Sequence, residues 1–209
     1  AYMAKQMLKE KGMDVRVVTT LHGTDITLVG SHPTYKTAVE FSINHSDVVT
    51  AVSNNLKETT NKLFNITNDI RVIYNFIDVE KYEVADKEEC KRFALAKPHE
   101  RIFTHVSNFR PVKRVEDVVR IFNEVRKEIP SKLLMIGEGP ERVKAEKLVK
   151  ELKLSEDVFF LGNSTEVTKI LCYTDVFLLP SQTESFGLAA LEAMAAGSAV
   201  ISTNTGGLP

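Results

Sequence analysis

The chain has 209 residues, is 43% hydrophobic and 26% charged, and carries a formal net charge of −1 at pH 7. This composition is typical of a soluble globular protein with one large domain or two small ones. It contains no basic block or aromatic-interleaved basic stripe, so it does not indicate a nucleic-acid partner. The longest apolar runs, such as Val176–Pro180, are too short to span a bilayer, so no membrane span is expected.

The two ends of the sequence lie inside predicted elements or directly after them. The first residues, AYMAKQMLKEKG, have the pattern of the end of an amphipathic helix and lack the apolar core of a signal peptide. The last residues, Gly206–Pro209, directly follow an apparent strand. We therefore expect this chain to be a fragment.

The chain has two cysteines, Cys90 and Cys172, which are far apart in the sequence and have no further cysteines beside them. This usage does not indicate a disulfide framework. A reducing cytoplasm is therefore the expected location.

Short apolar runs of strand length alternate with longer amphipathic runs along the chain. The predicted strands are rich in β-branched and aromatic residues, and they cover residues 15–20, 48–52, 71–74, 102–106, 133–136, 158–161, 176–179 and 199–202. Helical spacing predicts helices over residues 34–45, 53–64, 115–128, 140–152, 165–173 and 186–196. Ser53 is the predicted N-cap of its helix, and Pro140 is predicted in the first turn of its own.

Strand–helix alternation with nearly continuous apolar strands predicts an α/β fold, with parallel sheets covered by helices on both faces. The rhythm breaks once, over the charged residues 76–100, which predict a link between two domains with a short helix near residues 87–96. We therefore predict an incomplete first domain over residues 1–80. A nearly complete second domain is predicted over residues 81–209.

The segment Leu178–Gly197, LLPSQTESFGLAALEAMAAG, carries the strongest functional signal. A buried strand ends at Pro180, a polar loop follows, and a helix of small residues is predicted to begin near Phe186. Loops after parallel strands bind ligands in such folds, and the unpaired amides of a helix start suit a phosphate. Its carboxylates, Glu184 and Glu192, are good partners for sugar hydroxyls. The alternative is a loop carboxylate and a helix carboxylate that face solvent.

A second polar segment, THVSNFRPVKRV, follows the strand predicted over residues 102–106. It gathers Arg110, Lys113 and Arg114 within a few residues. A diphosphate that leaves with the bond electrons needs fixed positive charge, which Arg and Lys supply. The alternative is a solvated basic loop, although its place between a strand and a helix argues for a ligand.

Two further loops give weaker signals. In TLHGTD, His22 follows an apolar strand and precedes a glycine, so it could donate a hydrogen bond or act as a base; a structural histidine is the alternative. The IGEGP stretch at residues 136–140 is not GxGxxG, and we interpret it as a tight strand-to-helix turn. The histidines show no ligand spacing, so the sequence does not support a metal site.

Together these stretches resemble glycosyltransferase family 4, whose members have the GT-B architecture of two Rossmann-like doubly wound domains. The specific part is Glu184, seven residues and Glu192, within ESFGLAALEAMAAG and followed by Gly206–Pro209. TTLHGTDIT, VIYNFID and HVSNFRPVKRVEDVV are similar to family members that transfer N-acetylglucosamine to L-malate in bacillithiol biosynthesis. LLPSQTESFG occurs throughout the wider family and does not indicate the acceptor.

The resemblance implies a role for each matching residue. The implied donor-binding residues are Asn108, Arg110, Lys113, Glu184, Phe186, Gly187, Leu188 and Glu192, and the implied catalytic residues are His22, Arg110, Lys113 and Glu184. Arg110 and Lys113 would hold the diphosphate, Glu184 the sugar hydroxyls and Glu192 the ribose. It further implies retention of the anomeric configuration, UDP-N-acetylglucosamine as a substrate rather than a cofactor, and no metal.

Two alternatives stay open, and a third is disfavoured. The same chemistry could serve a lipid, wall-polymer or sugar acceptor, and a non-catalytic subunit that binds nucleotide sugars would keep the same residues. A nucleotide-dependent dehydrogenase would need GxGxxG after a first strand, which the visible strands lack. The expected partners are small molecules, a nucleotide sugar and L-malate, and a second copy of the chain in a homo-oligomer is a possible further partner.

Overall fold

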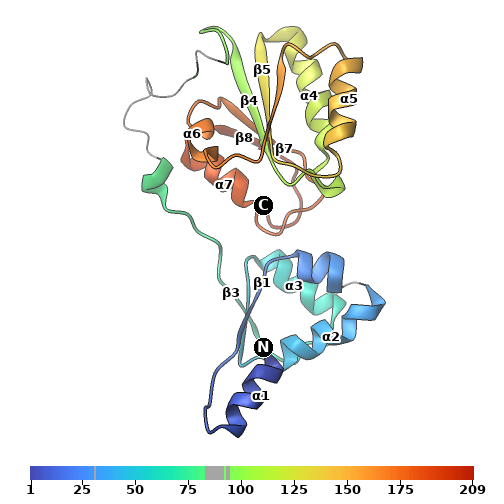
Figure 1. Ribbon diagram of the computed structural model, residues 1–209, viewed down its shortest axis with the longest axis vertical. Helices are drawn as coiled ribbons and strands as arrows, with labels where there is room; N and C mark the ends of the chain where they lie inside the picture. Colours follow the sequence, from blue (N-terminus) through green and yellow to red (C-terminus); the bar gives the residue numbers. More distant parts are fainter. Residues whose placement is uncertain (31, 83–91, 93–94) are drawn as a thin grey trace. The chain divides into compact units, whose positions relative to one another are not determined.

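The computed structural model describes residues 1–30, 32–82, 92 and 95–209. Its contacts divide it into two α/β units (Figure 1). The first comprises Ala1–Asn75, Glu184–Phe186 and Gly206–Pro209, and the second comprises Phe76–Thr183 and Gly187–Thr205. Each unit contains a parallel sheet with helices packed against it, as strand–helix alternation predicts.

The first unit has a small parallel sheet in the order β1-β2-β3. Its elements are α1 (Tyr2–Glu10), β1 (Val18–Leu21), the π-helical turn η1 (Asp25–Gly30), α2 (Pro33–Asn44), β2 (Val48–Ala51), α3 (Asn54–Leu63) and β3 (Ile70–Val72). A buried cluster that includes Leu21, Ile43 and Val49 joins the sheet to its helices. The predicted cap of α3 is confirmed, since Ser53 Oγ accepts the Leu56 amide at 3.1 Å.

The second unit has a five-stranded parallel sheet in the order β6-β5-β4-β7-β8. Its elements are η2 (Val79–Tyr82), β4 (Arg101–Val106), η4 (Pro111–Lys113), α4 (Val115–Glu128), β5 (Ser131–Ile136), α5 (Arg142–Glu151), β6 (Val158–Gly162), α6 (Val167–Leu171), β7 (Val176–Leu179), α7 (Leu188–Ala195) and β8 (Ala199–Ser202). Helices α4 and α5 cover one face of the sheet, and α6 and α7 lie on the other (Figure 1). Both faces are therefore buried, which explains why the strands read as continuous apolar runs.

The strand order of the second sheet reverses at its centre. From β4 the chain continues outward through β5 and β6, and it then returns to place β7 on the other side of β4. In open α/β sheets, the carboxyl ends of the two strands at such a reversal flank the ligand-binding crevice. The loops after β4 and β7 are therefore the positions at which the fold favours a site.

Most predicted elements are confirmed, with shifted ends. Pro140 does not lie in the first turn of α5, because this helix begins at Arg142 with Glu141 as its N-cap; the residues before it form a turn against the loop after β4. The helix predicted near residues 87–96 falls largely outside the described residues. Cys90 lies outside the described part of the chain.

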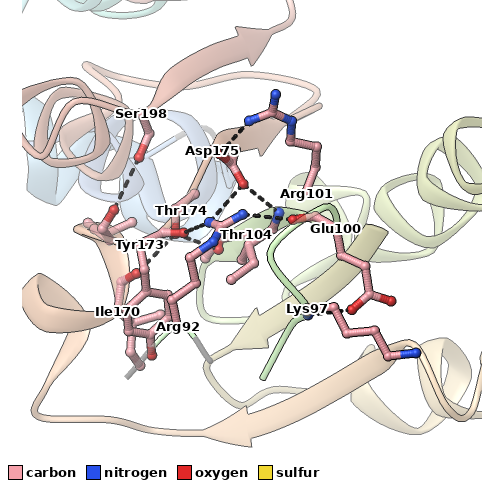
Figure 2. Close-up of polar contacts among 12 residues, drawn as sticks. Arg92, Lys97, Glu100, Arg101, Thr104, Ile170, Tyr173, Thr174, Asp175 and Ser198 are labelled. Carbon is pink, nitrogen blue, oxygen red and sulfur yellow. Dashed lines mark hydrogen bonds and ion pairs between the residues drawn. The ribbon is translucent and has the colours of Figure 1, made fainter. Parts of the chain in front are cut away.

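The amino-terminal edge of the second sheet is held by Asp175, the residue before β7 (Figure 2). Its Oδ2 accepts Arg92 Nη1 at 3.0 Å and the Ile102 amide at 2.8 Å. Its Oδ1 accepts Arg101 Nη1 at 3.2 Å. Arg92 also donates to the Glu100 carbonyl at 2.7 Å. The Asp175 carboxylate therefore joins β4, β7 and the segment before β4.

We expect Asp175→Asn to destabilise the protein by about 2 kcal/mol, because it removes the charge on which two guanidinium groups and a strand amide converge. Urea unfolding followed by circular dichroism measures this loss. The matched control is Asp69→Asn, which breaks an exposed pair with Lys57 at 3.3 Å and should cost less than about 0.5 kcal/mol. Equal losses in the two variants would contradict the role of Asp175.

Candidate functional site

The loop after β4 has a constrained backbone that holds its basic side chains. Phe109 lies in the left-handed region at φ 40° with its ring fully buried, and Arg114 lies there at φ 52°. Between them, η4 forms a single turn in which the Lys113 amide donates to the Arg110 carbonyl at 2.8 Å. Arg110 and Asn108 are exposed and Lys113 is half-buried. Burial of Phe109 offsets the cost of its backbone conformation, which is of order 1–3 kcal/mol.

The glycines of the GEGP turn are required by this loop. A Cβ on Gly137, at φ 125°, would lie 1.8 Å from the Ser107 carbonyl oxygen, and one on Gly139, at φ 158°, would lie 2.1 Å from that of Asn108. The Glu141 amide also donates to the Phe109 carbonyl at 3.0 Å. The predicted strand-to-helix turn is therefore confirmed, and its glycines allow two backbones to pack directly against each other.

The loop after β7 is tied to the basic loop within the second unit. The Gln182 amide donates to the Val112 carbonyl at 2.8 Å, which links the two loops that flank the strand reversal. Thr203 Oγ1 donates to the Ser181 carbonyl at 2.6 Å and supports the loop from β8. The main chain therefore holds the Arg110–Lys113 turn and the start of the Ser181–Gly187 segment together.

Helix α7 begins later than the sequence predicts. It starts at Leu188, and Gly187 is its N-cap in the left-handed conformation at φ 83°. The amides of Leu188 and Ala189 therefore open the helix, while Phe186 lies before it. The difference arises because a β-carbon disfavours a positive φ, so the glycine sets the boundary.

The contacts of Glu184–Phe186 place these residues in the first unit. The Gly207 amide donates to the Glu184 carbonyl at 2.7 Å, and a Cβ on Gly206 would lie 2.1 Å from that oxygen. The two glycines near the end of the chain thus pack on the Glu184 backbone. Phe186 lies against the buried cluster of this unit, and its ring centroid is 6.4 Å from that of Tyr74.

The His22 turn lies in the same unit. The Asp25 carboxylate accepts the Gly23 amide at 2.7 Å and the His22 amide at 3.2 Å, which fixes the turn before η1. A Cβ on Gly23, at φ 122°, would lie 1.7 Å from Ser185 Oγ, so this turn approaches the residue that follows Glu184. The His22 side chain is exposed. Asp25 is a positioning residue that sequence reasoning missed, although its place within HGTD was the available signal.

Glu192 lies half-buried on α7, where it bonds with the Tyr82 hydroxyl of η2. Burial raises the pKa of the Glu192 carboxyl, and the hydrogen bond from Tyr82 offsets part of that rise. Burial and the nearby Glu192 charge also raise the pKa of the Tyr82 phenol. Tyr82 is a partner that the sequence did not indicate, because it lies far from Glu192 along the chain.

The predicted site residues thus fall into two groups. Asn108, Arg110, Lys113, Gly187, Leu188 and Glu192 belong to the second unit, and His22, Glu184 and Phe186 belong to the first. Arg114, the third member of the basic cluster, pairs through Nε with Asp117 Oδ2 at 2.5 Å at the start of α4. In the part of the chain that the structure describes, no three His, Cys, Asp or Glu side chains gather as ligands for a metal ion.

Comparison with known families decides where this chain belongs. The sequence model of the family described as glycosyl transferases group 1 matches residues 86–209, and that of glycosyltransferase family 4 matches residues 1–81. The chain belongs to the group 1 glycosyl transferases. The matches cover the basic loop and the Glu184–Glu192 segment in one family, and the His22 turn in the other.

Relatives of this glycosyltransferase chain extend well beyond its length. It is 46% identical over 209 residues to N-acetyl-alpha-D-glucosaminyl L-malate synthase of Bacillus anthracis, covering 100% of this chain and 54% of that protein. It is 31% identical over 203 residues to an uncharacterised glycosyltransferase of Methanocaldococcus jannaschii, covering 91% of this chain and 52% of that protein. The chain therefore spans about half the length of these relatives.

Solved structures share the fold of the chain. The crystal structure of Anabaena HepE in complex with UDP and glucose matches with a TM-score of 0.84 at 20% sequence identity, over 99% of this chain and 56% of that one. With the parallel sheets described above, this likeness shows the predicted GT-B fold class. Among the described helices, none has both the length and the apolar character that crossing a bilayer requires.

We expect Gly137→Ala to cost about 3 kcal/mol or more, because the added methyl group would meet the Ser107 carbonyl and the backbone would stay at a positive φ. Thermal unfolding measures the loss. Gly197→Ala is the matched control, since Gly197 has φ 86° but nothing within 4 Å of an added Cβ; it should cost only about 1 kcal/mol. If both variants lose the same stability, the close approach of the two loops is not what requires this glycine.

The raised pKa of Glu192 predicts a pH-dependent effect of Glu192→Gln. The folded protein holds the Glu192 proton more tightly than the unfolded chain, in which the pKa of this carboxyl is near 4.5. Glu192 therefore contributes to the free energy of unfolding below that pH, and this contribution is lost as pH rises through the folded pKa. The free energy of unfolding of Glu192→Gln relative to wild type should therefore rise from acidic to neutral pH, as measured by urea titrations across that range.

Glu124→Gln is the control of opposite sign for this titration. The hydrogen bond from Lys127 lowers the pKa of Glu124. Glu124 therefore stabilises the fold at pH values above its unfolded-state pKa, and this stabilisation is lost as pH falls. Glu124→Gln should therefore lose stability relative to wild type as pH rises. The same pH slope in both variants would show that Glu192 is not penalised by burial.

Proposed function

We propose that this chain is part of a retaining glycosyltransferase that moves N-acetylglucosamine from UDP-N-acetylglucosamine to L-malate. The observation that carries the proposal is the loop after β4, which holds Arg110 and Lys113 at the strand reversal and bonds to the loop after β7. The 46% identity over the whole chain to the malate synthase of B. anthracis supports the donor and the acceptor.

The proposed roles follow from the chemistry of the side chains. Arg110 and Lys113 neutralise the diphosphate as the bond between the anomeric carbon and the phosphate oxygen breaks. The diphosphate leaves with the electron pair, and one of its oxygens accepts the proton of the malate hydroxyl as the new glycosidic bond forms on the same face of the sugar. No protein carboxylate is needed as a nucleophile, which leaves Glu184 to orient the sugar hydroxyls.

The remaining binding roles are proposed for α7 and the His22 turn. The amides at the start of α7 suit a phosphate or sugar oxygen, and Glu192 suits the ribose hydroxyls. A ribose would then share the Glu192 carboxylate with Tyr82. His22, held by Asp25, is proposed to donate a hydrogen bond to the reacting sugar. We further propose that no metal cofactor takes part and that the protein acts in the cytoplasm.

The deciding experiment uses the full-length gene product. It is incubated with UDP-N-acetylglucosamine, with and without L-malate and with and without a chelator, and UDP release and product mass are followed. Malate-dependent UDP release with a glycosyl-malate mass, unaffected by chelator, is expected, and NMR of the product should show the α-anomer. Donor binding without malate-dependent release would shift the proposal to a lipid, wall-polymer or sugar acceptor. Absence of donor binding would overturn it.

We expect Arg110→Ala and Lys113→Ala each to lower kcat by about 100-fold or more, because each removes a charge that stabilises the leaving diphosphate. Steady-state kinetics with saturating malate measure this effect. Arg120→Ala is the matched control, because Arg120 is an exposed arginine on α4 of the same unit, and its kcat should stay at the wild-type value. Near-normal kcat in both loop variants would remove the diphosphate role from this loop.

A further inference from the structure

A buried histidine joins the two central strands just where their main-chain pairing ends. The register of β4 on β7 runs over Phe103–Val176 and Thr104–Phe177. At the next residue, His105 is fully buried, and its Nδ1 lies 2.8 Å from the Leu178 carbonyl oxygen. The imidazole therefore continues the link between β4 and β7 toward the edge of the sheet that carries the proposed site.

The other side of the same imidazole reaches the basic loop. His105 Nε2 lies 2.8 Å from Ser107 Oγ, and Ser107 Oγ accepts the Phe109 amide at 3.2 Å. A carbonyl oxygen can only accept, so Nδ1 carries the proton, and in the neutral ring Nε2 accepts from the serine hydroxyl. The bonds form a continuous chain from the Leu178 carbonyl to the Phe109 amide.

Phe109 is the residue that turns the loop toward Arg110. Its φ of 40° is unfavourable for a residue with a β-carbon, and such a conformation persists only where its surroundings hold it. The Phe109 amide is bonded to Ser107 and its carbonyl to the Glu141 amide. Its ring lies near the His105 ring, with centroids 6.1 Å apart and planes inclined by 21°. The histidine thus supports both the backbone and the side chain of this residue.

We propose that His105 is a positioning residue, which sets the conformation of Phe109 through Ser107 and so fixes where Arg110 presents its charge. It acts on the diphosphate only through this loop, so the inference rests on the proposed function. The same imidazole joins the loop to β7, whose following loop leads to Glu184. The His105 side chain therefore connects the loop that carries Arg110 and Lys113 to β7, the strand before the loop that carries Glu184.

Two conservative substitutions distinguish the hydrogen bond at Nδ1 of His105 from the hydrogen bond at Nε2. A glutamine at residue 105 places its amide oxygen near the Nε2 position and keeps an acceptor for Ser107, whereas an asparagine places a donor near Nδ1 and keeps the bond to Leu178. We expect His105→Asn to lower kcat about tenfold with little change in the KM for malate. His105→Gln should retain most of the wild-type kcat.

Thr104→Val is the matched control for a general loss of packing between these strands. Thr104 is buried on β4 beside His105, and its Oγ1 lies 2.7 Å from that of Thr174, before β7 (Figure 2). Because side chains alternate along a strand, Thr104 faces the opposite side of the sheet from His105. Its substitution should lower the thermal stability as much as His105→Asn does, and leave kcat unchanged.

A double-mutant cycle in the full-length protein decides whether His105 acts through the loop. If it does, His105→Asn lowers kcat about tenfold in the wild-type background but less than about twofold in the Arg110→Ala background. Additive losses, or a kcat for Thr104→Val as low as that for His105→Asn, would overturn the proposal.

Hydrogen exchange of the Phe109 amide tests the positioning role without any turnover. We expect exchange to be at least about tenfold faster in His105→Asn than in His105→Gln or Thr104→Val. Equal rates in these variants would overturn the proposal even if the enzyme is active. A wild-type protein that releases no UDP from the donor would instead overturn the proposed function, and this exchange would then decide the structural part of the inference by itself.

Discussion

The pairing of β4 with β7 at the centre of the five-stranded sheet is the interaction on which the second unit depends. The strand order reverses there, and such a reversal is where open α/β sheets bind ligands. Short main-chain pairing between the two strands is extended by His105 at one end and by Asp175 at the other. Side-chain hydrogen bonds thus link β4 and β7 beyond both ends of their main-chain pairing.

Different contacts hold the amino-terminal and the carboxyl-terminal ends of the strands in this sheet. At the amino-terminal edge, Asp175 accepts hydrogen bonds from Arg92, Arg101 and a strand amide. At the carboxyl edge, the backbone is held by glycine contacts and positive-φ residues that leave Arg110 exposed to a ligand.

Much of the fold follows from local signals. Continuous apolar runs gave the strands, the 3.6-residue spacing gave α4 over Val115–Glu128, and Ser53 marked the start of α3. Helix starts were less accurate where tertiary packing decided them. Pro140 suggested an early start for α5, but the turn before it must pack against Asn108, and Gly187 rather than Phe186 sets the start of α7.

The sequence by itself determined the class of this protein: parallel α/β units, a basic loop after one strand, and the carboxylates Glu184 and Glu192 at the spacing typical of its family. These are properties of residue type and order, so they can be read without a structure. Only the tertiary structure decided which side chains contact the candidate site residues. His105 bonds to Ser107 of the basic loop, Tyr82 to Glu192, and Asp25 to the amides of the His22 turn, and no periodicity links these partners. The tertiary structure also decided that Arg114 pairs with Asp117 while Arg110 stays exposed. The physical reason is that a hydrogen bond or an ion pair depends on distances of about 3 Å, which only the packed chain sets.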